Sequence, residues 1–219
     1  MKTTKPITGP GNERLNAFSD GVFAIAITLL AFELHTDTAT GAAGLWAVLP
    51  ELATQYLGYI LGFAVLGIYW VGHHNLFLHI RHHDRVLLWL NNLFLMIIAT
   101  MPAVARLLTH DTNDLLAIVF YTGTLVAAGV ALELIWWYAS THRRLVEPNI
   151  DPQLVLYIHR RILLAPTLYL LTMTIAVYSR FTAVAMIVMI VLLYIVHNPL
   201  DDFFYGHLQG KKRREAMNQ

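Results

Sequence analysis

Long apolar runs alternate with short polar segments along almost the whole chain. A membrane-spanning helix needs about 20 consecutive apolar residues, within a range of about 17–25. We predict helices of this kind at residues 15–34, 45–72, 86–108, 115–140, 158–178 and 181–197. The pattern therefore predicts an all-α protein, a bundle of six transmembrane helices forming one domain over residues 1–219.

The last two apolar runs are separated only by Ser179 and Arg180. A single helix over both runs would be far longer than a bilayer is thick, so we predict a tight turn between them. The end of the chain is polar and basic, and we predict a short cytoplasmic tail over residues 207–219. Two roles remain open for this tail, namely a solvated segment that fixes orientation or a site for anionic lipid.

Composition and charge fit a protein surrounded by lipid. Hydrophobic residues make up 57% of the chain and charged residues only 13%, whereas soluble domains average about 25% charged residues. Of the 15 Lys and Arg, only Arg106 and Arg180 fall on one of the two predicted sides of the membrane. Because cytoplasmic segments are enriched in Lys and Arg, we predict that both termini are cytoplasmic.

The first predicted helix carries a bulky apolar stripe. At about 100° per residue, Ile25, Leu29 and Phe32 fall on one side of the helix, and Thr28 flanks them. The stripe is separate from the polar residues at the start of the helix.

Asp20 lies on nearly the opposite side of this helix, together with the small residues Ala24 and Ala31, and Ser19 also points away from the stripe. Small residues let another helix approach closely, so we expect Asp20 to lie among protein groups. A carboxylate near membrane depth is costly without partners, which makes Asp20 a candidate functional residue. The alternative is that Ser19 and Asp20 cap the start of an interfacial helix.

The pattern R-x-x-x-F-S-D opens the helix, at Arg14, Phe18, Ser19 and Asp20. With its continuation through residue 30, this motif resembles the first span of the transmembrane protein 175 family, the endolysosomal potassium channels of animals and their prokaryotic relatives. Trp70 followed by His73 and His74, and the segment 91–95 in the next predicted helix, also resemble that family. Animal members carry two six-helix repeats, whereas this chain carries one copy of the motif.

The resemblance implies a homotetramer in a prokaryotic plasma membrane, a multi-pass cell-membrane protein in which four copies of the first helix line a central pore. By position after the motif aspartate, Ile25 would form the narrow hydrophobic constriction and Thr28 would contribute to selectivity. Leu29 and Phe32 match further apolar pore positions, although Phe32 is larger than the aliphatic residue usual there.

The resemblance also implies that the four motif residues do not touch the ion. They would brace the pore helix against the next two helices instead. Trp70, His73 and His74 would then provide hydrogen-bond partners for Asp20 and Ser19, and which histidine does so stays open. Asn92, in the third predicted helix, is another candidate partner.

A ring of four Ile25 side chains would act as a hydrophobic gate, because a narrow apolar constriction loses its water and excludes ions. The sequence contains no T-V-G-Y-G filter, so selectivity would come from partial dehydration at the constriction. Potassium holds its water less tightly than sodium, and we therefore expect a modest preference for potassium.

Other polar residues offer few chemical sites. His79 and His83 are four residues apart and would suit one metal ion on a helix, but no third ligand has matching spacing and the chain has no cysteine. We therefore predict no metal and no cofactor. Glu133, inside the fourth predicted helix, is expected to snorkel or to pair with Arg143 or Arg144.

The leading functional hypothesis is a potassium channel whose partners are potassium ions, membrane lipid and its own copies, with no nucleic-acid partner. The alternative is a proton- or cation-coupled secondary transporter, which would need a broken helix or a midplane carboxylate and inverted repeats. The sequence shows neither feature. A membrane-bound redox or metal enzyme is also disfavoured, because no nucleophile constellation or phosphate-binding loop is present, and we predict that the protein is not an enzyme.

Overall fold

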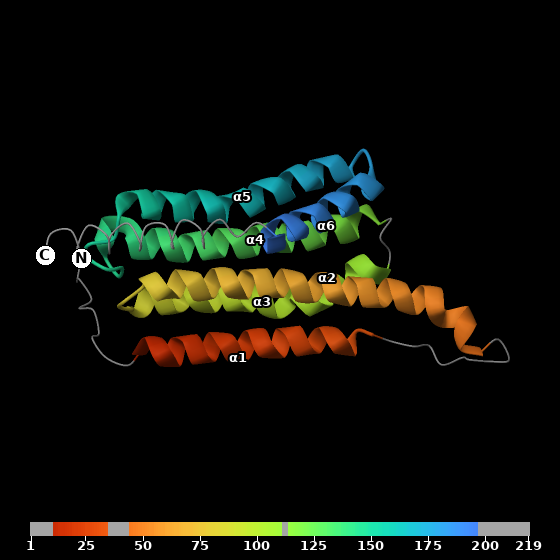
Figure 1. Ribbon diagram of the computed structural model, residues 1–219, viewed down its shortest axis with the longest axis horizontal. Helices are drawn as coiled ribbons and strands as arrows, with labels where there is room; N and C mark the ends of the chain where they lie inside the picture. Colours follow the sequence, from red (N-terminus) through yellow and green to blue (C-terminus); the bar gives the residue numbers. More distant parts are fainter. Residues whose placement is uncertain (1–10, 35–43, 111–113, 197–219) are drawn as a thin grey trace, which may run out of the picture.

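The chain folds into a bundle of α-helices that lie along one common axis (Figure 1). The computed structural model describes residues 11–34, 44–110 and 114–196. The elements within these ranges are α1 (Gly11–Phe32), α2 (Gly44–His79), α3 (Arg85–His110), α4 (Leu115–Ser140), the short 3-10 helix η1 (Thr141–Arg143), α5 (Pro152–Ala176) and α6 (Arg180–Val196). The predicted all-α class with six helices is confirmed, and the predicted tail at 207–219 lies outside the described residues.

Helix ends follow local packing and capping more closely than hydropathy. Helix α2 continues past the predicted end at residue 72 to His79, because Leu76 and Phe77 still pack into the core. Helix α5 begins earlier than predicted, since Asp151 accepts a hydrogen bond from the backbone N–H of Gln153 at 2.8 Å and caps the new helix. The tight turn predicted near residues 179–180 is confirmed at residues 177–179.

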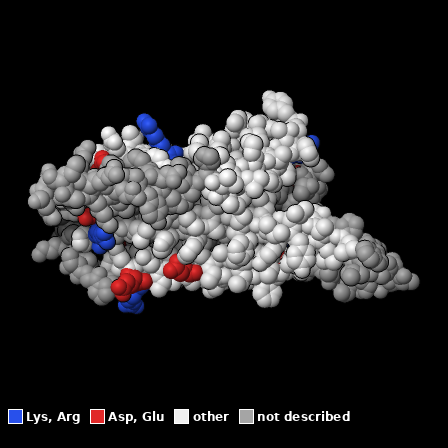
Figure 2. All heavy atoms as spheres, viewed as in Figure 1, with Lys and Arg blue, Asp and Glu red and all other residues white. Residues whose placement is uncertain are grey.

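Within the described ranges, five helices are long and apolar enough to cross a membrane, and α6 is shorter, with 17 residues. Successive helices run in opposite directions, so the start of α1 and the α2–α3 and α4–α5 connections share one end of the bundle (Figure 1). Most charged side chains on the face drawn in Figure 2 gather toward that end. Arg106 and Arg180 lie at the other end, where Arg106 pairs with Glu33 of the segment after α1 at 3.4 Å.

Helices α3 and α4 hold the bundle together. Helix α3 packs against α1, α2 and α4, while α4 packs against α5. Phe94 and Ile98 of α3 and Ile118, Leu125 and Ile135 of α4 are fully buried. Helix α1 therefore rests on α2 and α3 at one side of the bundle, away from α5 and α6 (Figure 1).

The connections at the charged end are tied to one another and to the start of α1. The backbone N–H of Arg81 donates to the carbonyl of Leu145 at 2.8 Å, which joins the α2–α3 connection to the segment before α5. The side-chain amide of Asn12 donates to the carbonyl of Ile80 at 2.8 Å, and the ring of His83 contacts the other side of that amide at 3.0 Å. The first turn of α1 is thus fixed relative to α2.

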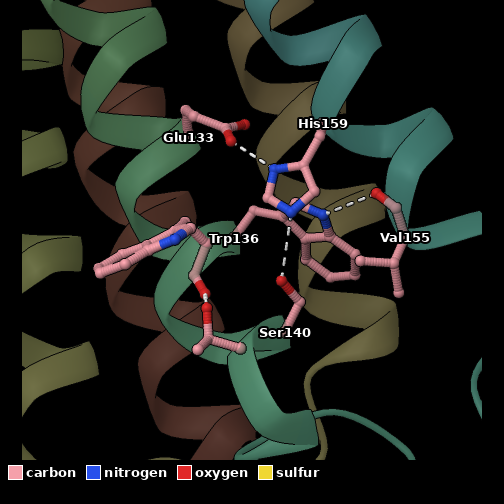
Figure 3. Close-up of polar contacts among 7 residues, drawn as sticks. Glu133, Trp136, Ser140, Val155 and His159 are labelled. Atoms are coloured by element: carbon pink, nitrogen blue, oxygen red, sulfur yellow. Dashed lines mark hydrogen bonds and ion pairs between the residues drawn. The ribbon is translucent and has the colours of Figure 1, made fainter. Parts of the chain in front are cut away.

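Glu133 corrects one sequence expectation. Its carboxylate is hydrogen-bonded to Nδ1 of His159 on α5, and not to Arg143 or Arg144 (Figure 3). The reason is that the chain reverses direction after α4, where His142 and Arg143 have φ values of 53° and 52°. This turn carries both arginines past the helix end, whereas His159 returns on α5 beside Glu133.

The surroundings of this pair are also polar and aromatic. Nε2 of His159 lies 3.4 Å from the hydroxyl of Ser140, and the indole N–H of Trp136 donates to the carbonyl of Val155 at 3.3 Å (Figure 3). The pair therefore joins α4 to α5 near the charged end of the bundle, on helices other than α1.

Candidate functional site

Helix α1 has one face that packs into the bundle. Its buried residues recur at helical spacing and are Leu15, Ser19, Phe23, Ala26 and Leu30. This spacing places them on one side of the helix, against α2 and α3. The polar member, Ser19, is fully buried and needs hydrogen-bond partners within the protein.

A second face of α1 is apolar and uncovered in the single chain. Phe18, Ile25, Leu29 and Phe32, which we call the exposed stripe, are 56%, 62%, 43% and 74% exposed. A continuous stripe of this kind on a helix marks a surface for lipid or for another chain. All of the residues that the sequence suggested for the pore lie on this face or beside it.

Thr28 flanks the exposed stripe and satisfies its own donor. Its hydroxyl donates to the carbonyl of Ile25 at 2.9 Å. Because the hydroxyl hydrogen is committed to the helix backbone, the oxygen lone pairs point away from that bond and remain acceptors. Thr28 can therefore present a partial negative charge to a cation beside α1.

The third face of α1 differs from the sequence expectation. Asp20, Ala24 and Ala31 were expected to pack closely against another helix, but they are exposed in the described part of the chain. The helices of the same chain pack against the Ser19 side instead, about 100° away around the helix axis. The carboxylate of Asp20 nevertheless accepts a hydrogen bond from the indole N–H of Trp70 on α2 at 2.8 Å.

A chain of buried hydrogen bonds joins α1, α3 and α2. The side-chain amide of Asn91 donates to the hydroxyl of Ser19 at 3.1 Å, and Nε2 of His73 donates to the amide oxygen of Asn91 at 2.8 Å. Ser19 in turn donates to the carbonyl of Leu15 at 2.9 Å. Ser19, Asp20, Trp70, His73 and Asn91 together form what we call the polar brace.

Aromatic rings fix the orientation of both α2 residues of the polar brace. The ring of His73 is nearly parallel to Phe94, with ring centroids 5.4 Å apart, and stacks on Phe77 at 4.4 Å. The indole of Trp70 stacks on His74 with centroids 5.6 Å apart. Of the two histidines, His73 is therefore linked to Ser19 through Asn91. His74 stacks on the ring of Trp70 and makes no bond of its own to Asp20 or Ser19 that the structure describes.

Three residues proposed from the sequence are exposed in the single chain. Asn92 is exposed, and its neighbour Asn91 makes the contact with Ser19, because one residue along a helix rotates a side chain by about 100°. The spacing of the buried residues Leu87, Asn91, Phe94 and Ile98 is the signal that could have identified Asn91. Arg14 and Phe18 are also exposed in the single chain, and Phe18 belongs to the exposed stripe.

The histidines of the α2–α3 connection have separate partners. His83 contacts Asn12, while the ring of His79 packs edge-on against Trp136 with centroids 6.3 Å apart. Among the described residues, no group of three or more His, Asp or Glu is placed to hold a metal ion.

Comparison with known proteins finds the same segment in a channel family. The sequence profile described as the endosomal/lysosomal potassium channel TMEM175 matches residues 14–102, which include the exposed stripe and the polar brace. A potassium channel of Streptomyces collinus is 39% identical over 142 residues, covering 63% of this chain and 69% of that protein. The endosomal/lysosomal proton channel TMEM175 of Bos taurus is 39% identical over 98 residues, covering 41% of this chain and 20% of that protein.

The fold is similar to that of a solved relative as well. The crystal structure of a lysosomal potassium-selective channel TMEM175 homolog from Chamaesiphon minutus superposes with a TM-score of 0.76 and 27% sequence identity. The match covers 86% of this chain and 98% of that chain. The similarity thus extends over nearly the whole helical bundle and is not confined to the motif.

Proposed function

Since the chain belongs to the TMEM175 family of ion channels, we propose that four copies of it form a potassium-permeable channel lined by α1. As a member of this family, the protein is a multi-pass membrane protein and a cation channel, and not an enzyme. The proposal adds the pore-lining helix, the number of subunits and the preferred ion.

The proposal rests on the different surroundings of two faces of α1. One face is held by buried contacts to α2 and α3, and the exposed stripe lies roughly 120° away around the helix. A closed ring of identical subunits requires each copy to offer the same surface to the axis. An apolar stripe on a helix that is anchored through a separate face meets this requirement.

In this arrangement Ile25 forms the constriction. Four Ile25 side chains around the axis would leave an apolar ring that conducts only when it is wide enough to hold water. Leu29 and Phe32 continue the same apolar wall toward the far end of α1. The ring is thus both the gate and the place where a passing ion loses part of its hydration shell.

Selectivity follows from the cost of this dehydration. Potassium gives up water at lower cost than sodium, and the acceptor lone pairs of Thr28, one turn from Ile25, compensate part of the loss. Because no rigid cage of carbonyl groups replaces the full hydration shell, we propose a modest preference for potassium over sodium.

The proposed orientation places both termini and the charged end of the bundle in the cytoplasm. Arg14, Arg81, Arg85, Arg143, Arg144, Arg160 and Arg161 belong to that end. The excess of basic residues is the usual mark of cytoplasmic segments. The membrane proposed is the plasma membrane of a prokaryotic cell.

Purified protein in liposomes with a potassium gradient tests the proposal, with a fluorescent dye reporting flux. We expect flux without an imposed proton gradient and a tetramer by native mass spectrometry. Ile25→Asn should increase the flux by wetting the ring, whereas Leu170→Asn, on the exposed side of α5, should leave it unchanged. Equal flux in the two variants would refute the pore assignment, and strict dependence on a proton gradient would indicate a coupled transporter.

A further inference from the structure

A cavity of about 630 Å³ lies on the flank of the bundle, between α2 on one side and α5 and α6 on the other. Helix α4 also contributes to its wall, through Gly129 and Leu132. The walls are predominantly apolar and include Phe63, Ile68, Leu132, Ile162, Ala165 and Ile195. None of the residues of the exposed stripe contributes to this cavity, which is therefore separate from the proposed pore.

The cavity is elongated along the bundle axis. Its lining residues on α2 extend from Phe63 to His79, a length of about 24 Å at 1.5 Å per residue. One leaflet contributes about half of the roughly 30 Å hydrocarbon core. The cavity is thus long enough to take an extended hydrocarbon chain that enters from the charged end.

Polar lining groups collect toward that end. They are Asn75 and His79 in the last turns of α2 and Arg161 of α5. The guanidinium of Arg161 lies 5.0 Å from the ring centroid of Tyr194. Two tyrosines of the lining use their hydroxyls internally, since Tyr69 donates to the carbonyl of Leu125 and Tyr194 to that of Arg161.

The cavity also touches the helix that carries the candidate pore face. Ile27 of α1 and Trp70 of α2 both line it, and Trp70 donates the hydrogen bond to Asp20. A molecule in the cavity would therefore pack against the same indole that holds the start of α1.

We propose that this cavity binds an anionic phospholipid, with one acyl chain along α2 and the headgroup near Arg161. The apolar length fits the acyl chain, and the cationic guanidinium complements a negatively charged headgroup. A zwitterionic phospholipid such as phosphatidylcholine gains the same apolar contact, but its quaternary ammonium offsets the charge of its phosphate, so its ionic contribution is smaller. The lipid packs against Trp70 of α2 and Ile27 of α1, and the channel retains it on extraction from the membrane.

Native mass spectrometry of the full-length protein tests this inference, using detergent micelles that contain phosphatidylglycerol or phosphatidylcholine. We expect the protein to retain phosphatidylglycerol in preference to phosphatidylcholine. Arg161→Gln should reduce phosphatidylglycerol retention about fivefold, the effect expected for one basic residue, while Arg160→Gln, its exposed neighbour outside the cavity, should not. Ala165→Phe should place a ring in the cavity one turn from Arg161 and reduce retention, while Ala185→Phe, exposed on α6, should preserve it.

Several results would overturn the inference. Equal losses in Arg161→Gln and Arg160→Gln would indicate unspecific surface charge, and equal retention of the two lipids would remove the role of the headgroup. If Ala165→Phe changed the mass of the assembly and not its lipid content, a second copy of this chain would be the occupant. Because the readout is bound lipid, failure here is distinct from failure of ion flux.

Discussion

The side-chain amide of Asn91 on α3 donates a hydrogen bond to the hydroxyl of Ser19 on α1 across 3.1 Å, and both residues are fully buried. The same amide accepts from His73 of α2, so one side chain connects three helices. Because these groups are removed from water, the loss of Asn91 leaves the ring N–H of His73 without its acceptor, whereas Ser19 keeps its bond to the carbonyl of Leu15. This position of Asn91 makes it the most sensitive point of the polar brace.

Replacing Asn91 by leucine should therefore destabilise the protein. The variant keeps a similar volume but leaves the ring N–H of His73 without its acceptor, at a cost of about 1–3 kcal/mol. Asn92→Leu, one position along on the exposed side of α3, is the matched control. Its free energy of unfolding should equal that of the wild type. Denaturant unfolding in detergent measures both. Equal stability of the two variants would show that the buried hydrogen bonds contribute nothing.

The bond between Trp70 and Asp20 should couple the two residues energetically. Trp70→Phe removes the indole N–H while retaining a ring that can stack on His74, and Asp20→Leu removes the acceptor. If both residues act through this hydrogen bond, each single variant should alter potassium flux. The double variant should then change the flux little more than either single variant does. Residues in contact show such non-additivity, whereas independent sites add. Strictly additive effects on flux would contradict the coupling.

Thr28 should affect ion preference more than stability. Thr28→Val removes the oxygen that compensates a partly dehydrated potassium ion, so the permeability ratio of potassium to sodium should fall, while Thr28→Ser should retain it. Thr100→Val is the control, since Thr100 of α3 makes the same type of bond, to the carbonyl of Ile97 at 2.7 Å. Reversal potentials under bi-ionic conditions give the ratio. A similar fall in Thr100→Val would argue against a role for Thr28 in the pore.

Replacing one member of the Glu133–His159 pair should destabilise the protein more than replacing both members by apolar residues. His159→Leu leaves a largely buried carboxylate without its imidazole, with an expected loss of about 1–3 kcal/mol. Changing both residues to leucine removes the polar pair and should restore part of this loss, because apolar replacement of a buried pair is often tolerated. Thermal unfolding of the two single variants and the double variant gives the comparison. A double variant less stable than both singles would rule out this account.

The helices were predictable because apolar length reports directly on the thickness of a bilayer. The helix boundaries were harder to predict, since hydropathy marks the edge of the lipid and a helix can continue beyond that edge. Residues 73–79 illustrate the difference, because they are partly polar but still bury Leu76 and Phe77. The early start of α5 depends on a cap by Asp151, which lies outside the apolar run.

In the candidate site, too, some features could be predicted from the sequence and others could not. Periodicity within α1 was sufficient to place Ile25, Leu29 and Phe32 on one stripe, because all three belong to one helix. Contacts between helices were harder, since they depend on how each helix is rotated. Spacing along α3 could have favoured Asn91 over the predicted Asn92, but its contact with Ser19, and that of Glu133 with His159 in place of the predicted arginines, required the packed bundle.

Close packing of α4 against α5 provides a last test, at two glycines of the same helix. A Cβ atom added at Gly129 would collide with the ring of Pro166, whereas at Gly123 it would meet nothing within 4 Å. The proline ring is rigid, so Gly129→Ala should separate the helices locally and cost about 1–3 kcal/mol. Gly123→Ala should instead be neutral or stabilising by up to about 1 kcal/mol, since alanine favours helix. Thermal unfolding in detergent compares them, and a Gly129→Ala variant as stable as Gly123→Ala would show that α4 and α5 do not approach as closely as described.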